Sequence, residues 1–464
     1  MLRHVIEKEL NDCIYGYRSL LMFILSTALF TMSVYLEARG YQADLQDYRL
    51  AQVSLRQSLG EETTLYALST FSFNLVKPPA VLGILVKGVE SYTPRVYGFR
   101  LFTLPTPQGS TVSENPTVAM FGALDTAFIV QVVLGLAALL FTFSAVCGEK
   151  EMGTLKLQLA NPLPKDVLLL GKLLGNLVGM LTPVALAFLL ASLLLMNFDG
   201  VSLGRDEFLR ALLIGLDFVL YLTVLFCLGI CVSTLTTRIT TAFVLSLVIW
   251  VALIAIVPKA AVILADRVAP LESLHAFEMK KAEVDRRGSL QYQEQVRKYA
   301  QEHVGQGWPR STVDELLRQV REDQNRELRR IDEDYTRRKE RQAHVALLLS
   351  RLSPAGSAAY AAMSLARTGL ERDFRFRAAL RDYRSLFTDY YDRKAGEEMA
   401  SIGDHPAGSV VVKHVFSDLP PFEFHEEPLA ASLDRALPDM GFLLVWGAAF
   451  FSLAYFRFLR YDVR

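Results

Sequence analysis

The sequence lacks the motifs that would make this chain an enzyme. It has no GxxxxGK[ST] phosphate loop, because Gly171-Lys172 in "LLLGKLLG" has neither the upstream glycine nor the hydroxyl residue that phosphate binding needs. It has no HExxH motif, and its seven histidines show no metal-ligand spacing on an expected helix. The sequence therefore gives no positive evidence for catalysis, and we expect no cofactor or metal in this chain.

Cysteine is scarce and net charge is absent. The chain has 49 basic and 49 acidic side chains, so its charge balance gives no reason to expect a nucleic-acid partner. The cysteines lie in or beside apolar segments, which argues against an exterior stapled by disulfides. Cys227 and Cys231 share a helix face, either as small contact residues or as a metal or redox pair. The four cysteines are Cys13, Cys147, Cys227 and Cys231.

The apolar residues, 52% of the 464, occur in blocks. Charged residues are nearly missing from several stretches of about twenty residues, the length that crosses a bilayer. The segment 273–345, by contrast, is dense in charge. This pattern predicts an all-α polytopic membrane protein, whose first span is an uncleaved anchor because no small-x-small cleavage site follows it. The six expected spans are 19–37, 123–146, 169–198, 210–233, 240–265 and 439–457.

Lysine and arginine in the short loops give the orientation. With six spans, the N-terminus, the loop 147–168, the turn at Arg238 and the tail 458–464 share one side, which the positive-inside rule makes cytosolic. Residues 1–18 have apolar positions at helical spacing, which predicts an amphipathic helix in the cytosolic interface. A frayed polar N-terminus is the alternative.

Two long segments, 38–122 and 266–438, then lie outside the membrane. The part at about 271–350 combines dense charge with spaced apolar residues, which predicts a helical hairpin broken near 305–309. We expect a mostly helical extracytoplasmic domain. The hairpin is either a solvated structure without a binding role or a surface for an envelope partner.

Two acids, Asp125 and Asp217, fall within the expected spans. Ionisable groups are costly in lipid and often mark a transport pathway. Both acids lie near the outer ends of their spans, so each is either an interfacial residue or a contact for a substrate or ion.

The loop 147–168 carries the strongest local pattern. It has charged residues on a short polar helix, a glycine break and then a second amphipathic helix, which together make a compact surface at the membrane. Such a surface suits docking of a soluble partner, and Glu149 and Glu151 could pair with basic groups on that partner. A simple connecting loop is the alternative. The candidate residues are Glu149, Lys150, Glu151, Gly153 and Thr154.

Residues 148–176, "GEKEMGTLKLQLANPLPKDVLLLGKLLGN", resemble the signature of ABC-2 type permeases, which runs E-x-E-x-G-T-L, a Pro-Arg/Lys step and L-G-K. Lys165 stands where arginine is common in that step. The six spans, the N-terminal helix and "RLSPAGSAAY" at 351–360 agree with this family. The long outer segments look like those of multi-copper-maturation-like or gliding-type permeases.

The resemblance implies the ABC-2 fold, similar to type V exporters, in a bacterial cytoplasmic membrane. It implies a permease that pairs with a second copy or homologue and with two cytosolic ATPase subunits, which bind ATP and Mg. Residues Glu149 to Thr154 would form the coupling helix that contacts an ATPase, and the complex would export a substrate that the sequence does not identify. The alternative is mechanotransmission or scaffolding through the extracytoplasmic domain.

Overall fold

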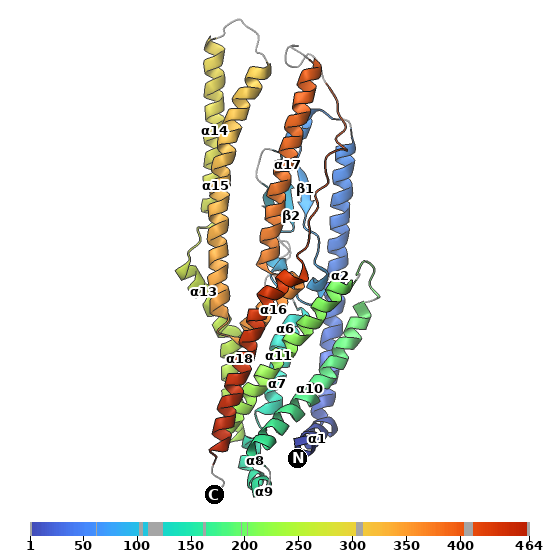
Figure 1. Cartoon of the computed structure of the whole chain (residues 1–464), viewed down its shortest axis with the longest axis vertical. Coiled ribbons are helices and arrows are strands. Elements are labelled where there is room, and N and C mark those ends of the chain that lie inside the picture. The colour runs from blue at the N-terminus through green and yellow to red at the C-terminus, as the bar shows by residue number, and fades with distance from the viewer. Residues whose placement is uncertain are drawn as a thin grey trace.

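The computed structural model describes residues 2–61, 63–101, 105–109, 124–160, 164–195, 197–201, 203–302, 310–402 and 412–461. The molecule is elongated, with a helical bundle at one end and long upright helices at the other (Figure 1). The first helix α1 (Leu2–Tyr15) and the last turn of α18 (Leu429–Leu459) lie at the bundle end. We call this the terminal end, and the end with the upright helices the opposite end.

Within the described residues, six helices are long and apolar enough to cross a membrane, which confirms the all-α polytopic class. Four of the expected spans fall inside one of them, whereas 123–146 begins before the second helix and 169–198 runs past the end of the third. Two are composite: the second joins α6 (Thr126–Phe128), η3 (Ile129–Leu134), α7 (Gly135–Thr142) and α8 (Cys147–Glu151), and the fifth joins α12 (Ile239–Val251), η4 (Ala252–Ile256) and α13 (Val257–Val268). The other four are α2 (Tyr17–Gly60), α10 (Lys165–Leu195), α11 (Arg205–Leu235) and α18.

The second and fifth spans each contain a π-helical segment, η3 and η4. A π segment interrupts the regular ladder and leaves carbonyl groups that need other donors. The Tyr221 hydroxyl donates to the Gln131 carbonyl of η3 at 2.9 Å, and the Ser353 hydroxyl donates to the Leu253 carbonyl of η4. Pro258 follows η4 and lacks an amide hydrogen, which accounts for the irregular turn at that place.

Helix α1 packs directly against α10 across a stripe of glycines. A Cβ atom added at Gly171 would lie 2.4 Å from Val5 Cγ1, and one at Gly175 would lie 2.6 Å from Glu9 Cβ. Only glycine at these positions allows the two backbones to come so close. The amphipathic N-terminal segment is therefore a packed helix and not a frayed end.

The opposite end contains a small antiparallel sheet in addition to helices. Its order is β1 (Phe73–Val76), β2 (Val96–Phe99) and β3 (Thr106–Gln108), after α3 (Leu65–Thr70), with η1 (Val81–Ile84) and η2 (Glu90–Tyr92) between β1 and β2. Helix α17 (Leu370–Ile402) covers the sheet with aromatic side chains. The packed aromatic rings of the sheet and of α17 include Phe73, Tyr97, Phe99, Phe376, Tyr383 and Phe387.

The expected hairpin is α14 (Leu274–Glu302) and α15 (Arg310–Ser350), which stand side by side (Figure 1). The expected break at 305–309 lies outside the described residues. Phe277 stacks on Tyr335 with ring centroids 4.1 Å apart, and Val284 and Leu328 form a small buried contact. The chain then enters α16 (Pro354–Ala366), which packs against both α11 and α18.

The glycine contact between α1 and α10 predicts the effect of one added methyl group. Gly175→Ala should displace α1, because the new Cβ meets the Glu9 side chain and the Ile6 carbonyl. Overpacking of this kind costs about 1–3 kcal/mol. We expect maleimide labelling of the buried Cys13 thiol to become roughly fivefold faster or more.

Gly215→Ala is the matched control, since a Cβ at Gly215 meets nothing within 4 Å. Peptide mass spectrometry would assign the label to Cys13 among the four cysteines. Equal labelling rates in the two variants would contradict the close packing of α1.

Candidate functional site in the loop between the second and third spans

The loop between the second and third spans forms the tip of the terminal end. Helix α8 and the short helix α9 (Thr154–Ala160) lie there, near the C-terminus of the chain (Figure 1). Gly153 separates them with φ of +73°, a conformation that side chains other than glycine rarely adopt. The glycine break expected from the sequence is therefore a backbone requirement, and residues 161–163 of the loop lie outside the described residues.

Lys150 caps the end of another span. Its ammonium donates to the carbonyls of Thr234 at 2.6 Å and Thr236 at 3.0 Å, at the last turn of α11. A helix ends with carbonyl groups that lack partners and carries partial negative charge there, so a cation stabilises it. The Ser233 hydroxyl of α11 accepts in return from the amides of Val146 and Cys147 at 2.9 and 3.0 Å.

Two more charged residues of this region act on helix ends. Glu151 accepts a 2.7 Å hydrogen bond from the amide of Ile239, the first residue of α12. Lys165 donates to the carbonyls of Leu459, the last residue of α18, and of Tyr461, at 3.1 and 3.0 Å. Each charge has the sign that the helix end favours. The loop and the first residue of α10 thus bind the ends of three different spans.

Lys172 is the centre of a buried ionic network. Its side chain is 2% exposed, and its ammonium lies 2.7 Å from Glu149 Oε1 and 3.0 Å from Glu9 Oε1. Gln158 of α9 donates to Glu149 Oε1 at 2.8 Å, and Asn176 donates to Glu9 Oε2 at 3.2 Å. The network joins α8, α9 and α10 to the N-terminal helix α1.

The structure places four of the five candidate loop residues in contacts within the chain. Thr154 bonds the Glu149 carbonyl at 3.5 Å, and Glu149 is engaged by Lys172, which differs from the expectation that its carboxylate is offered to a partner. Glu151 is exposed as a residue, although one oxygen is held by α12. A loop sequence rich in charge does not reveal these internal partners, because the hydrogen-bond partners of Lys150 and Glu151 lie 84 to 88 residues away.

The exposed surface of the loop is made by other residues. Met152 is 69% exposed and Leu157 is 72% exposed, and Lys156 beside them is also exposed. Large apolar side chains that project from a polar turn at the tip of a molecule commonly mark a contact with another protein. Sequence reasoning missed them, and the available signal was an apolar residue on each side of positions 153–156.

The two acids of the spans have opposite surroundings. Asp125 caps α6, since its two oxygens accept from the amides of Phe128 and Lys87 at 2.8 Å each. Asp217 lies fully buried in α11, and neither carboxylate oxygen has a hydrogen-bond partner among the described residues. The cap gives Asp125 a structural role, whereas Asp217 has no hydrogen-bonding role among the described residues.

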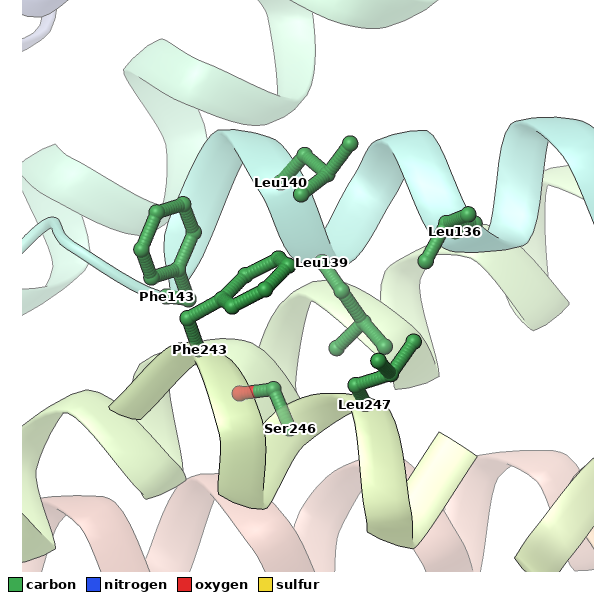
Figure 2. A pocket seen from close by; sticks show the side chains of 7 residues that line it. All are labelled: Leu136, Leu139, Leu140, Phe143, Phe243, Ser246 and Leu247. Carbon is green, nitrogen blue, oxygen red and sulfur yellow. The ribbon is translucent and has the colours of Figure 1, made fainter. Parts of the chain in front are cut away.

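A narrow pocket opens between α7 and α12 (Figure 2). Phe143 and Phe243 meet edge to face at its side, with centroids 5.6 Å apart. Its lining is apolar except for the Ser246 hydroxyl, so it offers no group that could hold a charged ligand. The lining residues are Leu136, Leu139, Leu140, Phe143, Phe243, Ser246 and Leu247.

The six apolar helices of the described residues define a multi-pass membrane protein. A family model described as ABC-2 family transporter protein matches residues 3–463. The chain therefore belongs to the ABC-2 family of transporter proteins, whose members are non-catalytic membrane subunits that work with ATPase subunits. No curated protein matches the chain in the comparison.

The buried network predicts the cost of removing its cation. Lys172→Met would leave Glu149 and Glu9 buried without a counter-charge, which typically costs about 3–5 kcal/mol. We expect the purified full-length protein to unfold at a clearly lower temperature. Adding Glu149→Gln and Glu9→Gln should restore part of the loss, because it removes the uncompensated charges.

Lys156→Met is the matched control, since Lys156 is exposed on α9 and should leave the unfolding temperature unchanged. An unfolding temperature of Lys172→Met equal to that of the control would show that the network contributes nothing to stability.

Proposed function

We propose that this chain is the permease subunit of an ATP-driven exporter and that an ATPase subunit docks on α8 and α9. The observation that carries this proposal is the set of contacts made by the loop. Its charged residues hold α11, α12 and, through Lys165, α18, and Lys172 ties it to α10 and α1. A displacement of this loop would therefore be passed to four spans at once.

The docking surface is the exposed tip, with Met152 and Leu157 as apolar anchors and Lys156 and Glu151 as polar neighbours. Apolar anchors surrounded by polar residues are the usual composition of an energetic hot spot in an interface. ATP and Mg bind to the partner in this proposal, since the present chain has no phosphate loop. Two ATPase subunits and a second permease copy complete the complex.

The terminal end is cytosolic in this proposal, and the membrane is the bacterial cytoplasmic membrane. Basic residues in short segments at that end support the orientation, because such residues are retained in the cytoplasm. The relevant residues are Arg3, Lys8, Arg18, Lys156, Arg238 and Arg457. The sheet, α17 and the hairpin then lie outside the cytoplasm.

Docking can be tested by placing charge on the apolar anchors. We expect Leu157→Glu, and separately Met152→Glu, to weaken binding of the partner ATPase by roughly 30-fold or more, as for a hot spot worth about 2 kcal/mol. Binding would be measured by titrating purified ATPase against the permease in lipid nanodiscs.

Tyr66→Glu is the control, because Tyr66 is 76% exposed but lies at the opposite end. Unchanged affinity in both loop variants would rule out this tip as the docking surface. These substitutions are cleaner than charge reversal at Glu149, which would also break the contact with Lys172.

Mechanotransmission is the second candidate function, and one observation favours it. The fifth span continues through α13 to the base of the hairpin, where α13 packs along α15. Gln342 of α15 donates to Asp266 of α13 at 3.0 Å. A movement of this span would therefore move the base of a long external hairpin, which could act on an envelope partner.

Shortening the hairpin separates the two functions. A variant that lacks residues 290–321, closed by a glycine-serine linker, keeps the contact of Gly288 with Gln324. A transporter of a small solute should retain both ATPase activity with its partner and rescue of a deletion strain. A mechanotransmitter should retain the ATPase activity but lose the rescue. A full-length chain with the same linker inserted at the hairpin tip is the control.

A further inference from the structure

Asp217 and Arg210 lie two turns apart on α11 and have contrasting environments. Both side chains are fully buried. The Arg210 guanidinium has four acceptors: Asp206, the carbonyls of Leu365 and Glu427, and the Ser432 hydroxyl. Neither oxygen of Asp217 has a hydrogen-bond partner among the described residues. A buried carboxylate without a donor is strongly unfavourable, so its charge must be either matched or removed.

The contacts of Arg210 show which residues of the neighbouring helices lie at the same depth as Asp217. Arg210 bonds Ser432 of α18, and a Cβ at Gly447 of α18 would lie 3.7 Å from Val224 of α11, so the two helices run in the same direction. Seven residues beyond Arg210 and Ser432 are Asp217 and Asp439, each about 10 Å further into the bundle. Asp439 is accordingly close enough to act on Asp217 electrostatically.

Helix α16 runs in the opposite sense, with Leu365 beside Arg210. Eight residues back on α16 is Ser357, which is fully buried at a similar depth and whose hydroxyl also has no partner among the described residues. Figure 1 shows α16 beside α11 and α18 at this level of the bundle. The site is thus formed by three helices.

The charges at this depth do not balance. Asp439 is paired with Arg351, with contacts of 2.6 Å from Nε and 3.3 Å from Nη2. Asp217 would add a second negative charge beside a single guanidinium. The elements η1, η3, α7, α12 and α16 have no charged residue, and those of α10 lie at the terminal end.

The remaining charged residues of α18 do not supply the missing charge. Asp434 is exposed, Arg435 is held by Glu427 and Glu371, and Arg457 lies at the terminal end. One negative charge would therefore remain unmatched in the interior of the bundle, where the cost of an isolated ion is highest.

We propose that Asp217 is an intramembrane proton-binding site and that the bound proton, by neutralising Asp217 beside Asp439, allows α16 and α18 to pack against α11. The proton comes from solvent and converts the carboxylate to the acid, with no other reactant. A metal ion is a poorer occupant, because it needs several oxygen ligands and no group of three or more His, Cys, Asp or Glu side chains in the described part of the chain could hold one. This inference does not depend on the docking of an ATPase.

Infrared spectroscopy of the full-length protein in lipid vesicles tests the proposal. At neutral pH the wild type should show the carbonyl stretch of a protonated carboxylic acid, and Asp217→Asn should remove that band. Asp439→Asn should also remove it, because Arg351 would then be free to pair with an ionised Asp217. Persistence of the band in Asp217→Asn would assign it to another group and overturn the proposal.

Thermal unfolding of the same variants provides a second measurement. Asp217→Asn should leave the unfolding temperature at neutral pH unchanged, since an amide replaces an acid that is already neutral. Asp125→Asn is the matched control and should lower it, because it weakens a cap that accepts two backbone amides. An equal loss in both variants would show that Asp217 is an ionised, partnered carboxylate and would refute proton binding.

Discussion

Helix ends leave backbone groups without partners, and a membrane offers few substitutes for water, so side chains must supply them. In this protein much of that requirement is met by one short region. Lys150 bonds carbonyls at the end of α11, Glu151 bonds the first amide of α12, and Lys165 bonds a carbonyl at the end of α18. The loop between the second and third spans therefore supplies hydrogen-bond partners to the ends of three other spans. The proposed docking of an ATPase on this loop rests on this dependence.

The sequence predicts the spans because soluble folds rarely contain apolar runs of membrane length, and it predicts the loop because its motif is distinctive. It does not predict how the loop charges are used. Glu149 looks like a solvent-facing residue, yet its partner is Lys172, and the same ammonium also binds Glu9 of α1. The approach of α1 depends on the glycines of α10. Such a network exists only after three distant segments have packed.

The surroundings of the buried charges on α11 also could not be predicted from the sequence. Asp217 stands out in the sequence as an acid in an apolar run, whereas Arg210 looks like an ordinary residue at a span end. Both are fully buried because α16, a helix that belongs to the external segment by sequence, packs against both α11 and α18. Three of the four acceptors of Arg210 come from residues 155 to 222 positions away, so no local pattern could identify them.

The helices α11 and α18 take part both in the loop contacts and in the cluster of buried acids. At the terminal end, Lys150 binds a carbonyl at the end of α11 and Lys165 binds one at the end of α18. Nearer the opposite end, α11 carries Asp217 and α18 carries Asp439. Asp217 and Thr234 are separated by about 25 Å along one continuous helix, which is stiff over that length. Arg351, at the base of the hairpin, is the partner of Asp439. A shift of α18 relative to α11 would therefore alter the loop contacts, the charge balance at Asp217 and the position of the hairpin base together. These two helices therefore connect the loop at the terminal end mechanically to the base of the hairpin.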